Sequence, residues 1–310
     1  FGAFIVRSGI IDSVHSFAND PERGLYLLGF TGFLIITSMI LFSFRLPILS
    51  SNKTIAALSK ESFISINNII FGTLIFSTML GILYPLIYEF LYEQKISVGA
   101  PFYNAIYIPT TILACLFLFF SIDSKWQRGF KKSFFVTPMF ISVILSIAST
   151  FATYYLLLIT DLWILISIFT GSLIIFRYLI VVKDYFLNNK YSNPFSIIAH
   201  LGLGILVISI ALNSELSTER ALNIKMNESD MYRDYKITFD DLRLIKRSNY
   251  DSVRASFLLT GPDGKNIELS PEKRKYFARG QVTTETAIHL TPLKDIYLSL
   301  IHISEPTRRR

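Results

Sequence analysis

Residues 195–212 read FSIIAHLGLGILVISIAL, eighteen residues that include no charged side chain and one histidine, His200. A helix needs about 20 predominantly apolar residues to cross a hydrocarbon core of about 30 Å. Asn193 can cap such a helix, and Pro194 suits its first turn. The stretch therefore predicts a membrane-spanning helix in which His200 lies about 9 Å from the start.

The same apolar character recurs five more times before this stretch. The further segments are 25–44, 63–88, 102–122, 134–159 and 162–182. Hydrophobic residues make up 51% of the chain and charged residues only 17%, which is too apolar for an ordinary soluble domain. The formal charge of +7 is not a nucleic-acid signal, because outside the last third most cations lie in short loops between apolar runs. We expect a polytopic membrane protein with no nucleic-acid partner.

The loops differ in charge, and the difference predicts orientation. Ten Lys or Arg residues lie in loops 45–61, 123–133 and 177–194, against three in segments 7–24, 89–101 and 160–161. Basic loops stay on the cytoplasmic side of a membrane. We therefore expect the first segment and the C-terminal third on the outer face.

The composition changes after Leu212. Alternating runs such as 235–239 and 253–259 indicate strands, and Gly261-Pro262-Asp263-Gly264 is a strong turn signal. The expected fold is an all-α polytopic membrane bundle, with about six full transmembrane helices plus part of one, and a small mostly-β extramembrane domain.

This interpretation divides the chain into four parts. Residues 1–24 form the end of a helix and an outer-face loop, and residues 25–212 form the bundle. Residues 213–297 form the outer β-rich domain. Residues 298–310 break its pattern and resemble the translated read-through of a sequencing adaptor, so we predict that they are a non-native tail.

His200 is the first candidate site residue. A titratable group is costly at membrane depth and is often functional there. Ser196, His200 and Gly204 share one helix face at spacing four, where glycine leaves room for another helix or for a flat ligand. A neutral imidazole is a good axial ligand for haem iron. The alternative is a histidine that hydrogen-bonds a neighbouring helix.

His15 is the second candidate, in an outer loop between Arg7 and Arg23. The two arginines could pair with an anionic group, or could simply anchor the chain at the membrane surface. A lone loop histidine is more often solvated than a ligand. His289 has no clustered partner in the sequence, and we interpret it as structural.

Other chemistry is scarce in the sequence. The single cysteine, Cys115, excludes an intramolecular disulfide or a CxxC site, and we expect it to be a small buried hydrophobe. Phosphate-loop, HExxH, GxSxG and GxGxxG motifs are absent. Acidic residues are nearly absent from the apolar segments, which argues against a transporter with an acidic proton relay.

Several stretches, taken together, resemble the CcmF family, the haem-lyase component of cytochrome c maturation in bacteria and some mitochondria. They are FIVRSGI (4–10), SVHSFA (13–18), DPERG (20–24), ESF (61–63) with NN (67–68), SVGAPFYN (97–104), AHLG (199–202), and PEKR (271–274) with TTE (283–285). They follow the family's order along nearly the whole chain.

The resemblance implies a role for each candidate residue. His15 falls on the family's outer-face histidine, which helps to ligate the haem being delivered, and this makes it the catalytic candidate. His200 falls on a ligand of a resident haem b. Arg7 and Arg23 could then hold the propionates of the delivered haem, which is the substrate.

The resemblance also implies partners and a location. Haem would arrive from the chaperone CcmE, and CcmH-type subunits would present apocytochrome c, whose CxxCH thiols receive the haem vinyl groups. The location would be a bacterial inner membrane, or alternatively a mitochondrial one, with the C-terminal domain on the periplasmic side.

The chain also departs from the family pattern. The tryptophan-rich haem-handling segment is absent, since only Trp126 and Trp163 occur. We expect that segment and one partner histidine for each haem to lie upstream, and a final membrane helix to follow the β domain. This fragment alone is then expected to be inactive. The alternative function is a polytopic transporter or scaffold subunit without haem, which would show no Soret band.

Overall fold

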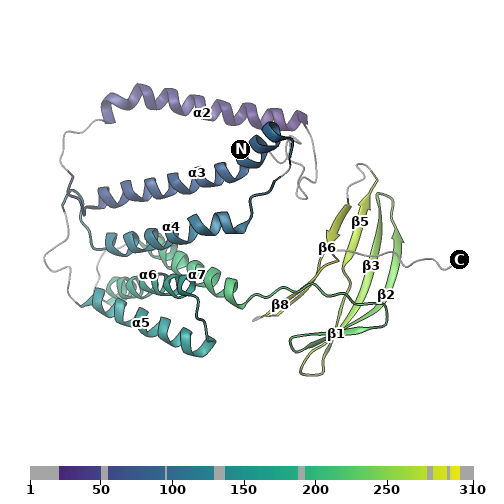
Figure 1. Ribbon diagram of the computed structural model, residues 1–310. Coiled ribbons are helices and arrows are strands. Elements are labelled where there is room, and N and C mark those ends of the chain that lie inside the picture. Colours follow the sequence, from purple (N-terminus) through teal and green to yellow (C-terminus); the bar gives the residue numbers. More distant parts are fainter. Residues whose placement is uncertain are drawn as a thin grey trace. The chain divides into compact units, whose positions relative to one another are not determined.

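A computed structural model of the protein describes residues 21–49, 55–94, 96–128, 137–187, 193–277, 282–291 and 294–300. The described residues form two compact units (Figure 1). The first contains the helices and ends at Thr218, and the second contains the strands from Glu219 onward. The first unit consists of long apolar helices, and the second consists of antiparallel strands with a small core.

The helical unit contains six long apolar helices among the described residues. They are α2 (Pro21–Leu49), α3 (Lys60–Tyr92), α4 (Ala100–Ser121), α5 (Pro138–Leu157), α6 (Leu162–Leu187) and α7 (Pro194–Leu216). All six are long and apolar enough to cross a membrane. Each matches a predicted segment, so the prediction of a polytopic bundle is confirmed. The partial helix expected within residues 1–11 lies outside the described residues.

Local signals in the sequence start two of these helices. The Ser59 side chain accepts a hydrogen bond from the backbone N–H of Ser62 at the start of α3. The Asn193 side chain accepts one from the N–H of Phe195, 3.0 Å away, with Pro194 in the first turn of α7. The predicted cap of α7 is therefore confirmed.

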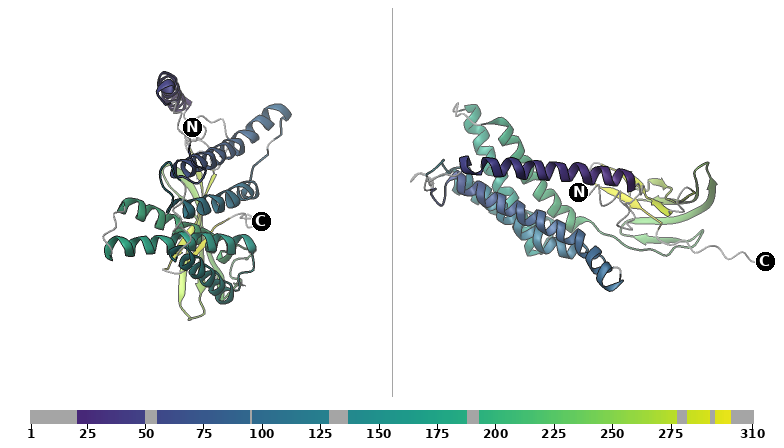
Figure 2. Two further views of the ribbon diagram at one scale, coloured as in Figure 1. Left: turned by 90° about the vertical axis from the view of Figure 1, so that its left-hand side faces the viewer. Right: turned by 90° about the horizontal axis from the view of Figure 1, so that it is seen from above.

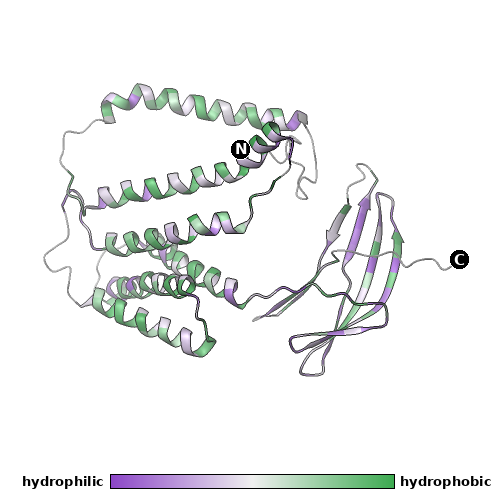
Figure 3. Cartoon of the chain, viewed as in Figure 1, coloured by the Kyte–Doolittle hydropathy of each residue, from purple (hydrophilic) through white to green (hydrophobic). Residues whose placement is uncertain are grey.

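The packing of the helical unit centres on α6. This helix contacts α4, α5 and α7, whereas α3 packs on α4. Helices α6 and α7 run side by side in opposite directions (Figure 2). Apolar residues run along the whole length of these helices (Figure 3). Most large apolar side chains of the unit are nevertheless exposed, as expected where lipid is the solvent. The hydropathy of this unit therefore reflects its membrane environment as well as its core.

The second unit is built from antiparallel strands. They are β1 (Ser229–Tyr232), β2 (Tyr235–Lys246), β3 (Tyr250–Thr260), β4 (Asn266–Leu269), β5 (Glu272–Tyr276), β6 (Val282–Glu285), β7 (Ala287–Leu290) and β8 (Asp295–Leu298). One sheet has the order β1-β2-β3-β5-β6, with β4 also paired to β3, and a second sheet consists of β7 and β8. The mostly-β domain predicted from the alternating runs is confirmed.

The strand patterns explain the core of the β unit. Alternate residues of β3, including Ala255, Phe257 and Leu259, are buried against Ile237 of β2 and Leu269 of β4. The other face of each strand carries polar residues, which is typical of an antiparallel sheet with one solvated side.

The predicted turn also forms in the β unit, between β3 and β4. The N–H of Gly261 donates to the carbonyl of Lys265 at 2.9 Å. Gly264 has φ +72°, a left-handed conformation that glycine adopts without steric cost.

Candidate functional site

His200 lies on α7 and is restrained by two neighbouring side chains. Its Nδ1 atom is 3.1 Å from the hydroxyl of Ser196, one turn earlier on the same helix. Its ring is stacked on Tyr178 of α6, with ring centroids 4.9 Å apart and an interplanar angle of 25°. The imidazole is half-buried. The structure thus brings together a titratable ring, a hydroxyl and an aromatic plane within the bundle.

The surroundings of this site are apolar. Tyr178 belongs to a buried cluster with Cys115, Ile174, Ile197 and Val207, which joins α4, α6 and α7. Cys115 is 1% exposed and therefore fills the core as the small buried hydrophobe that the sequence predicted. The face of His200 that Tyr178 covers therefore lies against an apolar part of the bundle.

Gly204 settles one alternative that spacing alone left open. A Cβ atom on Gly204 would lie 2.9 Å from the carbonyl oxygen of Gly171 on α6, and one on Gly171 would lie 3.0 Å from the carbonyl oxygen of Gly204. The space at Gly204 is therefore occupied by α6 and not by a flat ligand. Gly171 and Tyr178 are two turns apart on α6, so the face of α7 that carries Ser196, His200 and Gly204 packs on one stripe of α6.

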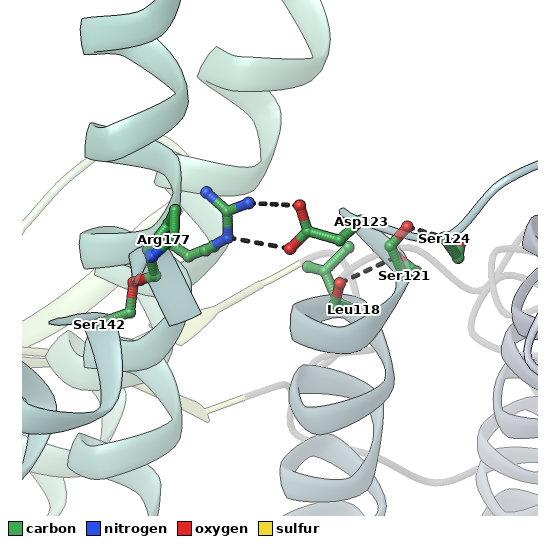
Figure 4. Close-up of polar contacts among 7 residues, drawn as sticks. Leu118, Ser121, Asp123, Ser124, Ser142 and Arg177 are labelled. Carbon is green, nitrogen blue, oxygen red and sulfur yellow. Dashed lines mark hydrogen bonds and ion pairs between the residues drawn. The ribbon is translucent and has the colours of Figure 1, made fainter. Parts of the chain in front are cut away.

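A buried ion pair lies beside this stripe. Arg177 is only 6% exposed, and its guanidinium binds the Asp123 carboxylate through two contacts, Nη2 to Oδ1 at 2.5 Å and Nε to Oδ2 at 3.2 Å (Figure 4). In the sequence analysis Arg177 lies where the apolar segment 162–182 and the basic loop 177–194 overlap, and the structure places it within α6. No Pro or Gly lies between Arg177 and the end of α6 at Leu187, and Asp123 neutralises the buried cation.

The same kind of extension affects Arg45, which lies within α2 rather than in the loop after it. The sequence did contain a signal for the ion pair that it missed. Asp123 is the only acid in the basic loop 123–133, and an isolated carboxylate of this kind needs a cationic partner.

Further contacts join the basic connections at one end of the bundle. The N–H of Lys60 donates to the carbonyl of Lys125 at 3.1 Å, and the N–H of Gln127 donates to both carboxylate oxygens of Glu61. The start of α3, the residues after α4 and the second half of α6 therefore meet at the same end. This arrangement agrees with the alternation of basic and non-basic loops along the chain.

The β unit matches a known family model. A family model described as the CcmF C-terminal beta-sandwich matches residues 215–308. Curated relatives cover 96% of the chain: it is 29% identical over 312 residues to the cytochrome c-type biogenesis protein CcmF of Pseudomonas aeruginosa, and 29% identical over 310 residues to that of Escherichia coli. The chain is therefore similar to CcmF proteins along nearly its whole length, and its C-terminal unit matches the family's beta-sandwich.

Two facts limit what this similarity shows about the function of the chain. The chain spans about half the length of the curated CcmF relatives that it matches, 47% in both of these cases. A solved structure titled Cytochrome c Heme Lyase CcmF matches with a TM-score of 0.64 over 90% of this chain and 44% of that one, at 16% identity. This second likeness shows that the CcmF fold is shared by most of the chain.

The remaining predicted site residues lie away from His200 in the sequence or outside the described residues. His15 and Arg7 fall outside the described residues, so their roles stay predictions. Arg23 lies in the first turn of α2. His289 lies on β7, opposite Ile296 of β8. Within the described ranges, no three His, Cys, Asp or Glu side chains converge as metal ligands, so a metal group here would depend on a single donor such as His200.

The end of the β unit bears on the predicted tail. Strand β8 runs to Leu298, Leu300 packs against the core, and the CcmF family match continues to residue 308. Residues 301–310 lie outside the described part of the chain.

The donor set at His200 fits a haem iron. Ser196 engages Nδ1, and among the described residues no hydrogen bond to Nε2 is formed, so Nε2 can coordinate in the tautomer that carries its proton on Nδ1. Metal-bound histidines commonly hold their second nitrogen in this way. His200 would hold the iron, and the apolar cluster around Tyr178 would exclude water from that side.

Proposed function

We propose that this chain forms part of a cytochrome c haem lyase, in which His200 ligates a resident b-type haem and His15 holds the haem being delivered. The observation that carries the proposal is the geometry of His200. Its imidazole is oriented by a hydrogen bond and a ring stack inside an apolar helix bundle. The names of the relatives in cytochrome c biogenesis support the same reaction class.

The reaction joins the two vinyl groups of haem to the two thiols of a CxxCH motif in apocytochrome c. His15 would hold the iron of the substrate haem and so orient its vinyl groups beside the thiols, which is catalysis by positioning. Arg7 and Arg23 would donate charge-assisted hydrogen bonds to its propionates. CcmE would supply the haem, and CcmH-type subunits would present the apoprotein.

His200 would act at a different place from His15. It lies about 9 Å along α7 from Pro194, at the end of the bundle where the basic connections meet, whereas His15 precedes α2. When bound, the resident haem supplies one-electron chemistry that can keep the delivered haem reduced. His200 itself would contribute a ligating nitrogen and a fixed ring orientation.

The proposed location is a bacterial inner membrane with the basic end in the cytoplasm. Residue 93 and the β unit would then lie on the periplasmic side, and residue 128 on the cytoplasmic side. Single cysteines at positions 93 and 128 should react with an impermeant thiol reagent from opposite sides of the membrane. The native Cys115 is buried and should contribute little background. Labelling of both positions from the same side would overturn this orientation.

The resident site can be tested by colour. The full-length protein that includes the upstream partner histidine, purified in detergent, should show a Soret band and a reduced b-type spectrum. His200→Ala should lose most of this haem, whereas the matched variant His289→Ala on β7 should retain it. Full haem content in His200→Ala would refute the assignment. A native protein without any Soret band would favour the transporter or scaffold alternative.

The delivery site needs a separate measurement. His15→Ala should leave the b-type spectrum largely intact but should severely lower cytochrome c maturation, because a transient ligand is needed only during transfer. Loss of the resident haem with normal capture of delivered haem would place His15 in the other site. Normal maturation in both His15→Ala and His15→Gly would remove His15 from the mechanism.

A further inference from the structure

Two contacts restrain His200 independently of each other. Ser196 is on the same helix and touches a ring nitrogen, whereas Tyr178 is on α6 and covers a ring face. The first contact can select which nitrogen carries the proton, and the second can select the plane of the ring. A histidine that only filled space would need neither.

The hydrogen bond to Ser196 has two possible directions. If the serine hydroxyl donates, Nδ1 is the acceptor and the neutral ring carries its proton on Nε2, where it blocks coordination. If Nδ1–H donates, the lone pair of Nε2 is free to bind a metal. Ligation of a haem iron through Nε2 requires the second direction, in which Nδ1–H donates to the serine oxygen 3.1 Å away.

The position of Tyr178 is itself held at two points along α6. On one side, Gly171 and Gly204 bring the backbones of α6 and α7 into close contact. On the other, the adjacent Arg177 binds Asp123 through two contacts and ties α6 to the end of α4. Rotation or sliding of α6 would break these contacts. The Tyr178 ring is thus presented to His200 by a rigid element.

We propose that Ser196 and Tyr178 are positioning residues for His200, and that they hold it as the Nδ1–H tautomer with Nε2 as the ligating nitrogen. This inference rests on the proposed function, since it assumes that His200 ligates a haem. It goes beyond that function because it names the nitrogen and the residues that select it. Neither residue touches the iron.

The serine contact should affect the redox potential. A hydrogen bond from Nδ1–H to an acceptor makes the imidazole a stronger donor, which stabilises the oxidised iron. Ser196→Ala should therefore raise the midpoint potential of the resident haem and lower haem affinity about 10-fold. Ser196→Thr keeps the hydroxyl and should restore both values. Ser167→Ala removes a hydroxyl of α6 that bonds only the carbonyl of Trp163, and should change neither.

The tyrosine contact should affect the ring orientation. Tyr178→Leu removes the aromatic plane, so the imidazole can rotate, and the low-spin electron paramagnetic resonance g values of the oxidised haem should shift and broaden. Tyr178→Phe keeps the plane and should give g values close to those of the native protein.

The outcomes separate this inference from the function on which it rests. If His200→Ala keeps its haem, the proposed function fails. The positioning role alone fails under a different set of results. In that case His200→Ala loses haem, but the midpoint potential is unchanged in Ser196→Ala and the g values are unchanged in Tyr178→Leu. Should Tyr178→Leu not accumulate in membranes, the potential of Ser196→Ala decides, because that substitution removes a single oxygen. A raised potential that Ser196→Thr reverses supports the inference, and an unchanged potential overturns it.

Discussion

The helical unit and the β unit each bury one member of an ion pair, but the buried charges have opposite signs. In the helical unit the side chain of Arg177 is 8% exposed and that of Asp123 is 32% exposed. In the β unit the side chain of Glu272 is 7% exposed, whereas its partners Arg254 and Arg274 are 42% and 27% exposed. In both units, one buried charge therefore depends on more exposed partners.

The difference lies in the surroundings of each pair. An arginine can bury its long apolar stem among membrane helices while its charge is met at a helix end. A glutamate has no such stem and is held instead by donors on two sides, Arg254 on β3 and Arg274 on the same strand, β5. Among the described residues, the buried Arg177 is therefore neutralised by one carboxylate, Asp123, whereas the buried Glu272 is neutralised by two arginines.

The largest effect should follow from removing Asp123, the ion-pair partner that the described residues offer Arg177. Asp123→Ala leaves the Arg177 cation buried and unpaired, which should cost about 3–5 kcal/mol of unfolding free energy. Thermal unfolding in detergent would measure this loss. The double variant Asp123→Ala/Arg177→Met should recover most of it, because an apolar pair can replace a buried ion pair. An unchanged stability of Asp123→Ala would show that water reaches Arg177.

A smaller effect should follow from neutralising the buried acid of the β unit. Glu272→Gln keeps the size of the side chain but weakens charge-assisted hydrogen bonds from Arg254 and Arg274, at a cost of about 1.5–3 kcal/mol. Both arginines reach solvent, so water limits the damage. Amide hydrogen exchange of β3 and β5 would report the loss locally, with exposed Asp263→Asn as the control. If Glu272→Gln and Asp123→Ala lowered the unfolding free energy equally, the number of ion-pair partners would not explain the difference between the two units.

The close helix contact gives a third test within the helical unit alone. Gly204→Ala would place a Cβ atom 2.8 Å from Cγ1 of Ile175 and 2.9 Å from the Gly171 carbonyl, so α6 and α7 must separate. Overpacking of this kind costs about 1–3 kcal/mol. Gly202→Ala on the same helix meets nothing within 4 Å and should be neutral or slightly stabilising in the same unfolding assay. Similar results for both variants would mean that Gly204 does not set the helix distance.

The smallest effect concerns pH and should appear only in the β unit. Burial raises the pKa of Glu272, but the hydrogen bonds from Arg274 and Arg254 outweigh it and hold the pKa below the ordinary value of 4.5. A lowered pKa contributes stability above the unfolded-state value that is lost as the pH falls through the folded-state value. Exchange protection of β3 and β5 should therefore decrease on acidification below about pH 4.5, and Glu272→Gln should flatten that dependence. An identical acid profile in this variant would assign the effect to other carboxylates.

The helices could be predicted from the sequence because they lie in a membrane. Segments such as 195–212 must satisfy their backbone polar groups internally in lipid, so length and apolarity suffice to predict a helix. The same reasoning left Arg177 where segment 162–182 overlaps the basic loop 177–194, and placed Arg45 just after segment 25–44. Helices α6 and α2 continue through these residues, and only a partner such as Asp123, 54 positions away in the sequence, makes the buried charge tolerable.

The candidate site was predicted only in part. The position of His200 and its shared face with Ser196 and Gly204 follow from helical spacing, which is a local property. The stacking of Tyr178 on that ring could not be predicted, because it depends on how two antiparallel helices are aligned along each other. That alignment is decided where Gly171 meets Gly204, and spacing within one helix carries no information about it.

The sequence by itself determined the six apolar helices, the strand-rich C-terminal unit, the cap of α7 and the family resemblance, because each depends on residues that are close together in the chain. Tertiary structure alone decided that α6, and not a flat ligand, fills the space at Gly204. It also decided that Arg177 is buried against Asp123 and that Tyr178 covers His200. These features depend on contacts between separate helices, whose geometry comes from packing and charge compensation rather than from local pattern.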